Sequence, residues 1–353
     1  MRKRNIYVVA FGIVALIILL AAASTFVFNQ APSQNVSLSN LSNYGPAPNV
    51  QGIAAWINSP PLNISQLHGK VVLIDFWTYS CINCIRSIPH LNAWYNAYGN
   101  NGLVIIGVST PEFGFEHNYT NVLNAVNQFG IKYPVALDNN YDTWTAYNNH
   151  YWPADYLIDK NGDVRYAAFG EGGYNQTEEA IRALLENAGY TVRANLTSVP
   201  LGINFSGIGT PEIYLGWDTA RQPIGNSQGF SPNKTVDYST PSITQNSTVY
   251  FSGSWYNAPD GMISVNGSKL FLVYRAKNVN VVASGNSTLT VKLDGSGLPG
   301  DYLGNDDQLV NGTAQARVGA ARLYNIVSGP GYAWHRLEID ASPGFKVYTF
   351  TFG

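Results

Sequence analysis

The feature that most constrains this chain is Cys81-Ile82-Asn83-Cys84, which contains both cysteines of its 353 residues. The motif directly follows an apolar run, Val71 to Trp77, that predicts a buried strand. A structural disulfide stabilises a protein by closing a long loop, and a spacing of two residues closes almost none. At a helix N-terminus, the helix dipole and the free amides instead favour a cysteine thiolate. The motif therefore predicts a redox-active pair.

Metal binding is the other common use of a C-x-x-C motif, and it requires two or more further ligands. The five histidines are spread thinly along the chain, and no two of them stand at ligand spacing. We therefore expect no metal, and no cofactor other than a Cys81–Cys84 disulfide.

The N-terminus has the composition of an export signal. Arg2, Lys3 and Arg4 precede an uncharged, mostly apolar run from Ile6 to Phe28. At about 23 residues this run is long enough to cross a bilayer of ~30 Å as a single transmembrane helix. The basic residues would stay in the cytoplasm and the rest of the chain would lie outside. The three alanines at 21–23 leave a cleaved signal peptide as the alternative, and both interpretations export the protein.

The surface is expected to be polar but poor in charge. Charged residues make up 12% of the chain, about half of the usual ~25%, and the net charge is −2. No basic face is available for nucleic acid, so we exclude that class of partner. Repeated N-x-S/T sequons suit an N-glycosylated exported protein, although an Asn- and Ser-rich chain also generates them by chance. They include Asn35, Asn63, Asn118, Asn175, Asn233, Asn266, Asn286 and Asn311.

Changes in composition divide the chain into five segments. Residues 1–29 form the membrane anchor or signal peptide, and residues 30–50, rich in Ser, Asn and Pro, predict a flexible tether. Apolar runs alternate with helical stretches over residues 51–193, which is typical of an α/β domain. A linker follows at 194–209. Short β-branched and aromatic runs over 210–353 predict an all-β sandwich or jelly roll.

Local patterns place the elements within the two domains. Thr177 is the expected N-cap of the last helix of the α/β domain, and Asn161-Gly162 predicts a hairpin turn. The α/β strands are expected at Val71–Trp77, Leu103–Val108, Val135–Leu137, Tyr156–Asp159 and Val164–Phe169, and the helices at Cys84–Tyr98, Val122–Phe129 and Glu178–Ala188. The strands of the second domain are expected at Val249–Ser252, Leu270–Tyr274, Val279–Ala283, Leu289–Leu293, Arg336–Ile339 and Lys346–Phe352.

The segment IDFWTYSCINCIRSIP, Ile74 to Pro89, resembles the thioredoxin family position by position. In that family a strand ends in Asp-Phe-Trp, a C-x-x-C opens a helix, and a proline follows the second cysteine by five residues. YWPADYLID, Tyr151 to Asp159, resembles the segment that carries the family's cis-proline, which implies a cis Pro153. PPLNISQLHGKVVLIDFWTYSCINC, IIGVSTPEFGFE, YPVALDNNY, TPEIYLG and YTFTFG further resemble the DipZ branch, with its carbohydrate-binding-module-like β domain.

The resemblance implies a role for each site residue. Cys81 would attack a substrate disulfide, Cys84 would resolve the mixed disulfide, and Asp75 would take the proton from Cys84. An Asp75 held only by strand-end hydrogen bonds is the structural alternative. Trp77 and Trp152 are expected to wall the active-site surface, with packing as the alternative. The expected substrate contacts are Trp77, Ile82, Asn83, Trp152 and Pro153.

The sequence departs from the related cytochrome c maturation reductases at Ser87, where many of them carry an acidic residue. Glu112, Glu116 and Arg86 are the remaining charged candidates near the site, and we expect them on the solvated surface. The multi-helix membrane domain usual in DipZ proteins is absent from this sequence. We therefore expect a separate membrane protein to donate electrons.

These features predict an extracytoplasmic thiol-disulfide oxidoreductase that acts on exported cysteine-containing proteins, apocytochrome c among them. They do not decide whether it reduces, oxidises or isomerises the disulfides of these proteins. One alternative is a peroxidase of the peroxiredoxin type, prompted by Thr78-x-x-Cys81, although Ile74 stands where that family has proline. The other is a surface glycan-binding protein with a thioredoxin scaffold. Its sugar-stacking aromatics would be Trp255, Tyr256, Tyr302 and Trp334.

Overall fold

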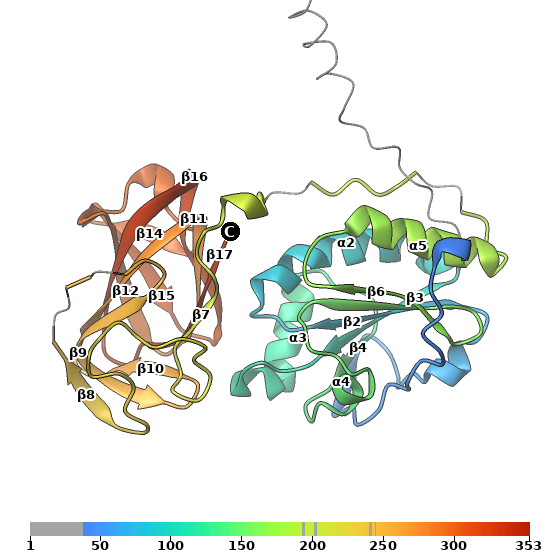
Figure 1. Cartoon of the computed structure of the whole chain (residues 1–353), viewed down its shortest axis with the longest axis horizontal. Helices are drawn as coiled ribbons and strands as arrows, with labels where there is room; N and C mark the ends of the chain where they lie inside the picture. The colour runs from blue at the N-terminus through green and yellow to red at the C-terminus, as the bar shows by residue number, and fades with distance from the viewer. Residues whose placement is uncertain (1–37, 193–194, 201–202, 240–241, 244) are drawn as a thin grey trace, which may run out of the picture.

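The computed structural model describes residues 38–192, 195–200, 203–239, 242–243 and 245–353, which form two domains side by side (Figure 1). The segment Ile6–Phe28, predicted to span a membrane, lies outside these residues. Within the described residues, no helix is both long and apolar enough to cross a bilayer.

The N-terminal domain is built on a six-stranded mixed sheet in the order β1-β4-β3-β2-β5-β6. The central strand β2 (Val71–Trp77) pairs in parallel with β3 (Leu103–Ser109) and antiparallel with β5 (Ala154–Ile158). The sheet is completed by β1 (Ala55–Ile57), β4 (Val135–Leu137) and β6 (Val164–Phe169). The predicted strands therefore all form, with the bounds of β2, β4 and β6 as expected.

Helices cover both faces of this sheet. Side chains from α2 (Ile82–Tyr98), α3 (Tyr119–Gln128) and α5 (Tyr174–Asn187) share one core with the odd-numbered positions of β2. The even-numbered positions of β2 pack against the short α4 (Asp142–Ala146) and the segment before β2. The prediction that Thr177 caps the last helix is wrong. The helix begins one turn earlier, after Gly173 at φ 63°, and the Thr177 hydroxyl donates to the Gly173 carbonyl at 3.3 Å.

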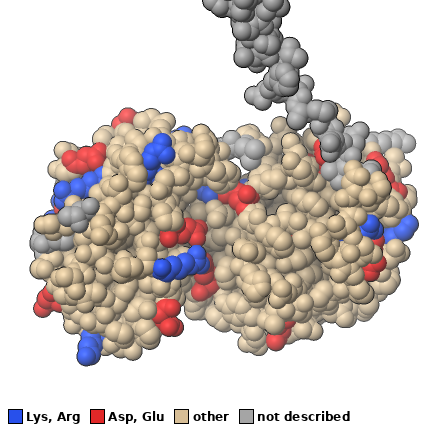
Figure 2. All heavy atoms as spheres, in the orientation of Figure 1, with Lys and Arg blue, Asp and Glu red and all other residues tan. Residues whose placement is uncertain are grey.

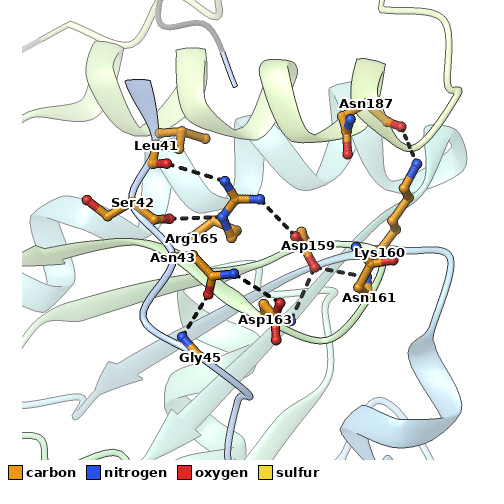
Figure 3. A network of polar contacts seen from close by, with 10 residues as sticks. All are labelled: Leu41, Ser42, Asn43, Gly45, Asp159, Lys160, Asn161, Asp163, Arg165 and Asn187. Atoms are coloured by element: carbon orange, nitrogen blue, oxygen red, sulfur yellow. Dashed lines mark hydrogen bonds and ion pairs between the residues drawn. The ribbon is translucent and has the colours of Figure 1, made fainter. Parts of the chain in front are cut away.

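The predicted tether is ordered where the structure describes it. Tyr44 and Ala47 donate their N–H groups to the carbonyls of Val164 and Gly162, each at 2.9 Å. Arg165 bonds the carbonyls of residues 41 and 42 and pairs with Asp159 at 3.0 Å (Figure 3). Residues 41–47 thus lie along the β5–β6 hairpin, because its backbone groups and Arg165 supply partners that composition does not reveal.

The C-terminal domain is one antiparallel β structure whose sheet order is β14-β15-β12-β16-β11-β17-β10-β9-β8. Two strands predicted as separate, Leu270–Tyr274 and Val279–Ala283, are halves of the long β11, with a register shift between Ala276 and Asn278. Further pairing of β11 with β9 curls the sheet around its core. The strands are β7 (Ile213–Tyr214), β8 (Thr235–Tyr238), β9 (Val249–Ala258), β10 (Gly261–Ser264), β11 (Ser268–Ser284), β12 (Ser287–Leu293), β13 (Ser296–Gly297), β14 (Asp307–Val310), β15 (Thr313–Val318), β16 (Arg322–Ala341) and β17 (Lys346–Phe352).

The aromatic residues proposed to stack on sugars are differently placed. Trp255 is fully buried in the core of the C-terminal domain, because it faces inward on β9 against Phe251 and Phe345. Tyr256 and Tyr302 are half-buried, and Trp334 is exposed. The expectation of an exposed Trp255 is therefore wrong.

The two domains meet through an aromatic cluster. Phe113 and Phe115, from the loop after β3, pack on Tyr348 of β17 with ring centroids 5.2 and 5.0 Å apart. Tyr214 and Val282 complete the buried cluster. Figure 2 shows a mostly uncharged face, with charged side chains of both signs gathered where the domains adjoin. Packing of apolar side chains therefore holds the second domain against the first.

We expect Phe113→Ala to uncouple the two domains. Phe113 is 3% exposed, and truncating a buried phenylalanine costs about 3 kcal/mol. Calorimetry should resolve a second unfolding transition that the parent chain lacks. Phe205→Ala, which removes a ring 48% exposed, is the control and should leave the thermogram unchanged. An unaltered thermogram for Phe113→Ala would contradict the role of this cluster.

Candidate active site

Cys81 lies where the central strand gives way to helix α2, and it caps that helix. Its Sγ accepts a hydrogen bond from the N–H of Cys84 at 3.2 Å. Both cysteines are free thiols, with Cys81 9% and Cys84 1% exposed. The sulfur that a substrate can reach is therefore that of Cys81, and a helix amide is placed to stabilise its thiolate.

Cys84 is the inner sulfur. Burial raises the pKa of its thiol, and the neighbouring Cys81 and the carboxylate of Asp75 raise it further. Cys84 is thus held as a neutral thiol, and it needs a base before it can act as a nucleophile.

Two carboxyl groups lie behind the cysteines. Asp75 on β2 stands directly opposite Asp155 on β5 in the antiparallel register. Both oxygens of Asp75 and Oδ1 of Asp155 are buried with no hydrogen-bond donor among the described residues. Burial raises the pKa of Asp155 to about 7, and burial together with Asp155 raises the pKa of Asp75 well above its usual value. Two facing carboxyls in such surroundings hold one proton between them.

Two further buried polar groups lie in the core around the carboxyl pair. The Tyr133 hydroxyl and Trp77 Nε1 are buried without a partner among the described residues. Burial and the charges of Asp75, Asp155 and Cys84 raise the pKa of Tyr133. Trp77 is 1% exposed, so the expectation that it walls the surface is wrong. Strand alternation puts it on the same inner face as Asp75, two residues earlier.

The other predicted contacts lie around the cysteines. The Trp152–Pro153 peptide is cis, as predicted. The Trp152 indole donates to the Thr110 carbonyl at 3.2 Å and lines a cavity of about 160 Å³ that also contacts Cys81 and Asn83. Ile82 lines a second, larger cavity.

Residues of the C-terminal domain form part of the wall around Cys81. The cavity beside Cys81 is lined by Tyr214, Arg221 and Thr349 together with Trp152. Tyr214 also donates its hydroxyl to the Glu112 carboxylate, joining the two domains beside the sulfur. Sequence reasoning missed these residues because nothing local in the chain indicates which face of the β domain meets the cysteines.

The acidic residues of the loop after β3 are not solvated, contrary to expectation. Glu116 is 1% exposed, and it accepts hydrogen bonds from the Ser80 hydroxyl at 2.5 Å and from the Phe113 N–H at 2.9 Å. Burial raises the pKa of Glu112 to about 7. Phe113 and Phe115 bury this loop against the second domain, and their presence beside Glu116 is the sequence signal from which its burial could have been predicted.

Arg86 and Ser87 are also engaged within the fold. Arg86, expected on the solvated surface, is half-buried and paired with Glu171 at 2.7 Å. Ser87, which stands where many relatives carry an acid, shares a hydrogen bond with the Tyr174 hydroxyl at 3.1 Å. The polar environment of helix α2 is thus set by residues of α5 and the turn before it.

Known proteins match both domains. Residues 46–167 match the AhpC/TSA family, and residues 210–353 match a thioredoxin-like C-terminal domain. The thiol-disulfide oxidoreductase ResA of Bacillus anthracis is 31% identical over 140 residues, which are 40% of this chain and 75% of ResA. The chain belongs to the thioredoxin-like family of thiol-disulfide oxidoreductases.

Protein DipZ of Mycobacterium tuberculosis is 40% identical over 337 residues, which cover 91% of this chain and 46% of DipZ. The chain thus spans about half the length of that relative. A solved thioredoxin-like protein in its oxidised form is 28% identical and aligns with 40% of this chain and 96% of its own, at a TM-score of 0.38. The matches to ResA and DipZ confirm the predicted family, and the alignment with DipZ extends over the second domain.

We expect Asp155→Asn to stabilise the protein at pH 8 more than at pH 5. The pKa of Asp155 rises from 3.8 to about 7 on folding, so the folded chain binds more protons in this interval and stability falls as pH rises through it. Replacing Asp155 by Asn should raise the free energy of unfolding at pH 8 by a few kcal/mol, which is about the free energy that corresponds to the pKa shift.

Urea denaturation at both pH values measures this effect, with the exposed Asp301→Asn as the matched control. A pH dependence that is the same in Asp155→Asn as in the parent chain would show that Asp155 does not hold the proton.

Proposed function

We propose that this protein reduces disulfides in cysteine-containing proteins by thiol–disulfide exchange at Cys81 and Cys84. The observation that carries the proposal is the asymmetry of the two sulfurs. Cys81 retains some exposure and accepts an amide hydrogen bond, whereas Cys84 is enclosed next to a carboxyl pair. This is the arrangement that a nucleophilic and a resolving cysteine require.

In the first step, the Cys81 thiolate attacks one sulfur of the substrate disulfide. That S–S bond breaks, a mixed disulfide forms, and the other substrate sulfur leaves as a thiolate that takes a proton from water. In the second step, Cys84 gives its proton to the Asp75–Asp155 pair and attacks the Cys81 sulfur. The bond between Cys81 and the substrate sulfur breaks, and that sulfur leaves as a thiolate that takes a proton from water. The substrate has then gained two electrons and holds two thiols, and the protein holds the Cys81–Cys84 disulfide.

The surroundings of the dithiol support the reducing direction. A dithiol becomes a stronger reductant when its thiolates are not stabilised, because stabilised thiolates favour the reduced form. Here the burial of Cys84 most of all, then the neighbouring Cys81 and the charge of the carboxyl pair at Asp75, disfavour a thiolate at the inner sulfur. We therefore assign the protein to the reductases.

We propose further that the protein works outside the cytoplasm. The basic residues 2–4, the apolar run that follows and the many sequons support this location. Its substrates would be exported proteins with cysteines, including apocytochrome c. A membrane-embedded dithiol protein would return the Cys81–Cys84 disulfide to the dithiol, and no other redox group is needed.

Cys84→Ser is expected to trap the mixed disulfide. Without the resolving thiol, the reaction stops after the first step, and mass spectrometry should find the substrate bound to Cys81. Cys81→Ser is the matched control and should capture nothing. If both single variants reduced substrate as the parent does, the proposed exchange would be wrong.

The reduction potential of the Cys81–Cys84 couple should lie closer to about −270 mV, as in thioredoxin, than to about −120 mV, as in a strong oxidant. Equilibration with glutathione buffers followed by alkylation and mass spectrometry measures it. A value near the oxidising end would reverse the proposed direction while leaving the exchange chemistry intact.

A further inference from the structure

A cavity of about 820 Å³ lies between helix α2 and the C-terminal domain. Its volume falls within the ~300–1,000 Å³ of sites that hold ligands. Ile82, Ile85 and Arg86 line it from the helix, and residues of β11 and β16 line it from the other domain. It borders the same first turn of α2 as the redox motif.

Residues of α3 and of the segment between the domains complete the lining of this cavity, and its two main walls differ in chemistry. The wall from the C-terminal domain is rich in neutral hydrogen-bonding side chains, namely Asn278, Asn280, Asn305, Asn325 and Ser328. The wall from helix α2 offers the apolar side chains of Ile82, Ile85 and Pro89. An asparagine side chain can offer a donor and an acceptor to the C=O and N–H groups of a peptide backbone. Asn325 uses both within the fold, since it donates to Asn280 and accepts from the Asn305 N–H, so the other asparagines carry this role.

The amide side chains are held in place by one another. Asn325 donates to the Asn280 side chain at 3.0 Å, and the Ser328 hydroxyl donates to the Asn278 side chain at 3.1 Å. Such mutual bonds orient the polar wall before any ligand arrives. A ligand therefore meets a preformed surface rather than a set of mobile side chains.

The charges in this cavity are paired internally. Arg86 bonds Glu171 at 2.7 Å, and Arg322 bonds Asp306 at 2.7 Å. A charged side chain that entered would lose water without gaining an unpaired opposite charge, and such desolvation is costly. Moving a neutral polar side chain from water into the cavity would cost far less free energy.

The cavity is placed to receive the same molecule that reacts with Cys81. Asn83 lines the small cavity beside Cys81, and its neighbour Ile82 lines the large one. A chain joined to Cys81 through its own sulfur needs to cross only the first turn of α2 to reach the asparagine wall. The small cavity, at about 160 Å³, leaves little room for a folded surface beside the sulfur.

We propose that the large cavity is a polypeptide-binding site that selects the segment flanking the substrate cysteine. It takes an extended segment whose side chains are uncharged, with its backbone against the asparagines and its side chains toward Ile82 and Ile85. This inference rests on the proposed function and adds its substrate class. The C-terminal domain is then the part of the protein that sets specificity.

The test uses the reduced full chain and three peptides of equal length. Each peptide has one cysteine linked by a disulfide to 2-mercaptoethanol, with flanks of Ser and Asn, of Asp, or of Lys. Single-turnover rates are followed by mass spectrometry of the acid-quenched protein. We expect the neutral peptide to react about tenfold faster than either charged peptide at equal ionic strength.

Asn278→Asp places an unpaired charge in the cavity wall and should raise the ratio of the Lys-peptide rate to the Asp-peptide rate about tenfold. Because both rates come from one variant, a general loss of reactivity cancels. Ser328→Asp tests the same wall a second time, with the melting curve of each variant reporting its fold. Asn266→Asp, at an exposed position outside the lining of the cavity, is the matched control and should leave the ratio unchanged.

Equal rates for the three peptides, or a ratio that neither cavity variant moves, would overturn the proposed site. Bis(2-hydroxyethyl) disulfide, which has no peptide segment, separates this outcome from failure of the function. Reaction with that compound but no discrimination among peptides refutes the cavity alone. No reaction with any of the four disulfides refutes the proposed exchange activity itself.

Discussion

The hydrogen bond from the Cys84 N–H to the Cys81 sulfur is the interaction on which the site depends. It makes Cys81 the N-cap of helix α2, so the helix starts at the end of the central strand. That geometry turns one sulfur toward the cavity between the domains and the other toward the core. The different roles of the two cysteines thus follow from the hydrogen bond that the first turn of the helix makes with the Cys81 sulfur.

The buried acids behind Cys84 lower the stability of the folded protein when they ionise. Asp75 and Asp155 face each other with little else to bond, and each raises the free energy of ionising the other. Replacing either would relieve this repulsion. Their position beside the inner thiol gives the pair a use, because a shared proton site with an elevated pKa can accept a proton from Cys84 near neutral pH.

The loop after β3 connects the chemistry to the second domain. Its phenylalanines anchor the β domain, while Glu116 bonds the residue just before Cys81 and Glu112 bonds Tyr214. Docking of the domain and shaping of the redox cavity therefore depend on the same few residues. A second domain held this way acts as a wall of the site rather than as a separate module.

The elements whose signal is local could be predicted from the amino-acid sequence. Periodicity placed strands β2, β4 and β6, spacing identified the redox pair, and a short motif marked Pro153 as cis. Three features of the site depend instead on the folded chain: Asp155 opposes Asp75, Glu116 is buried, and asparagines of the second domain face helix α2. Strand register and domain docking arise from contacts between residues far apart in the chain, and no local pattern encodes them.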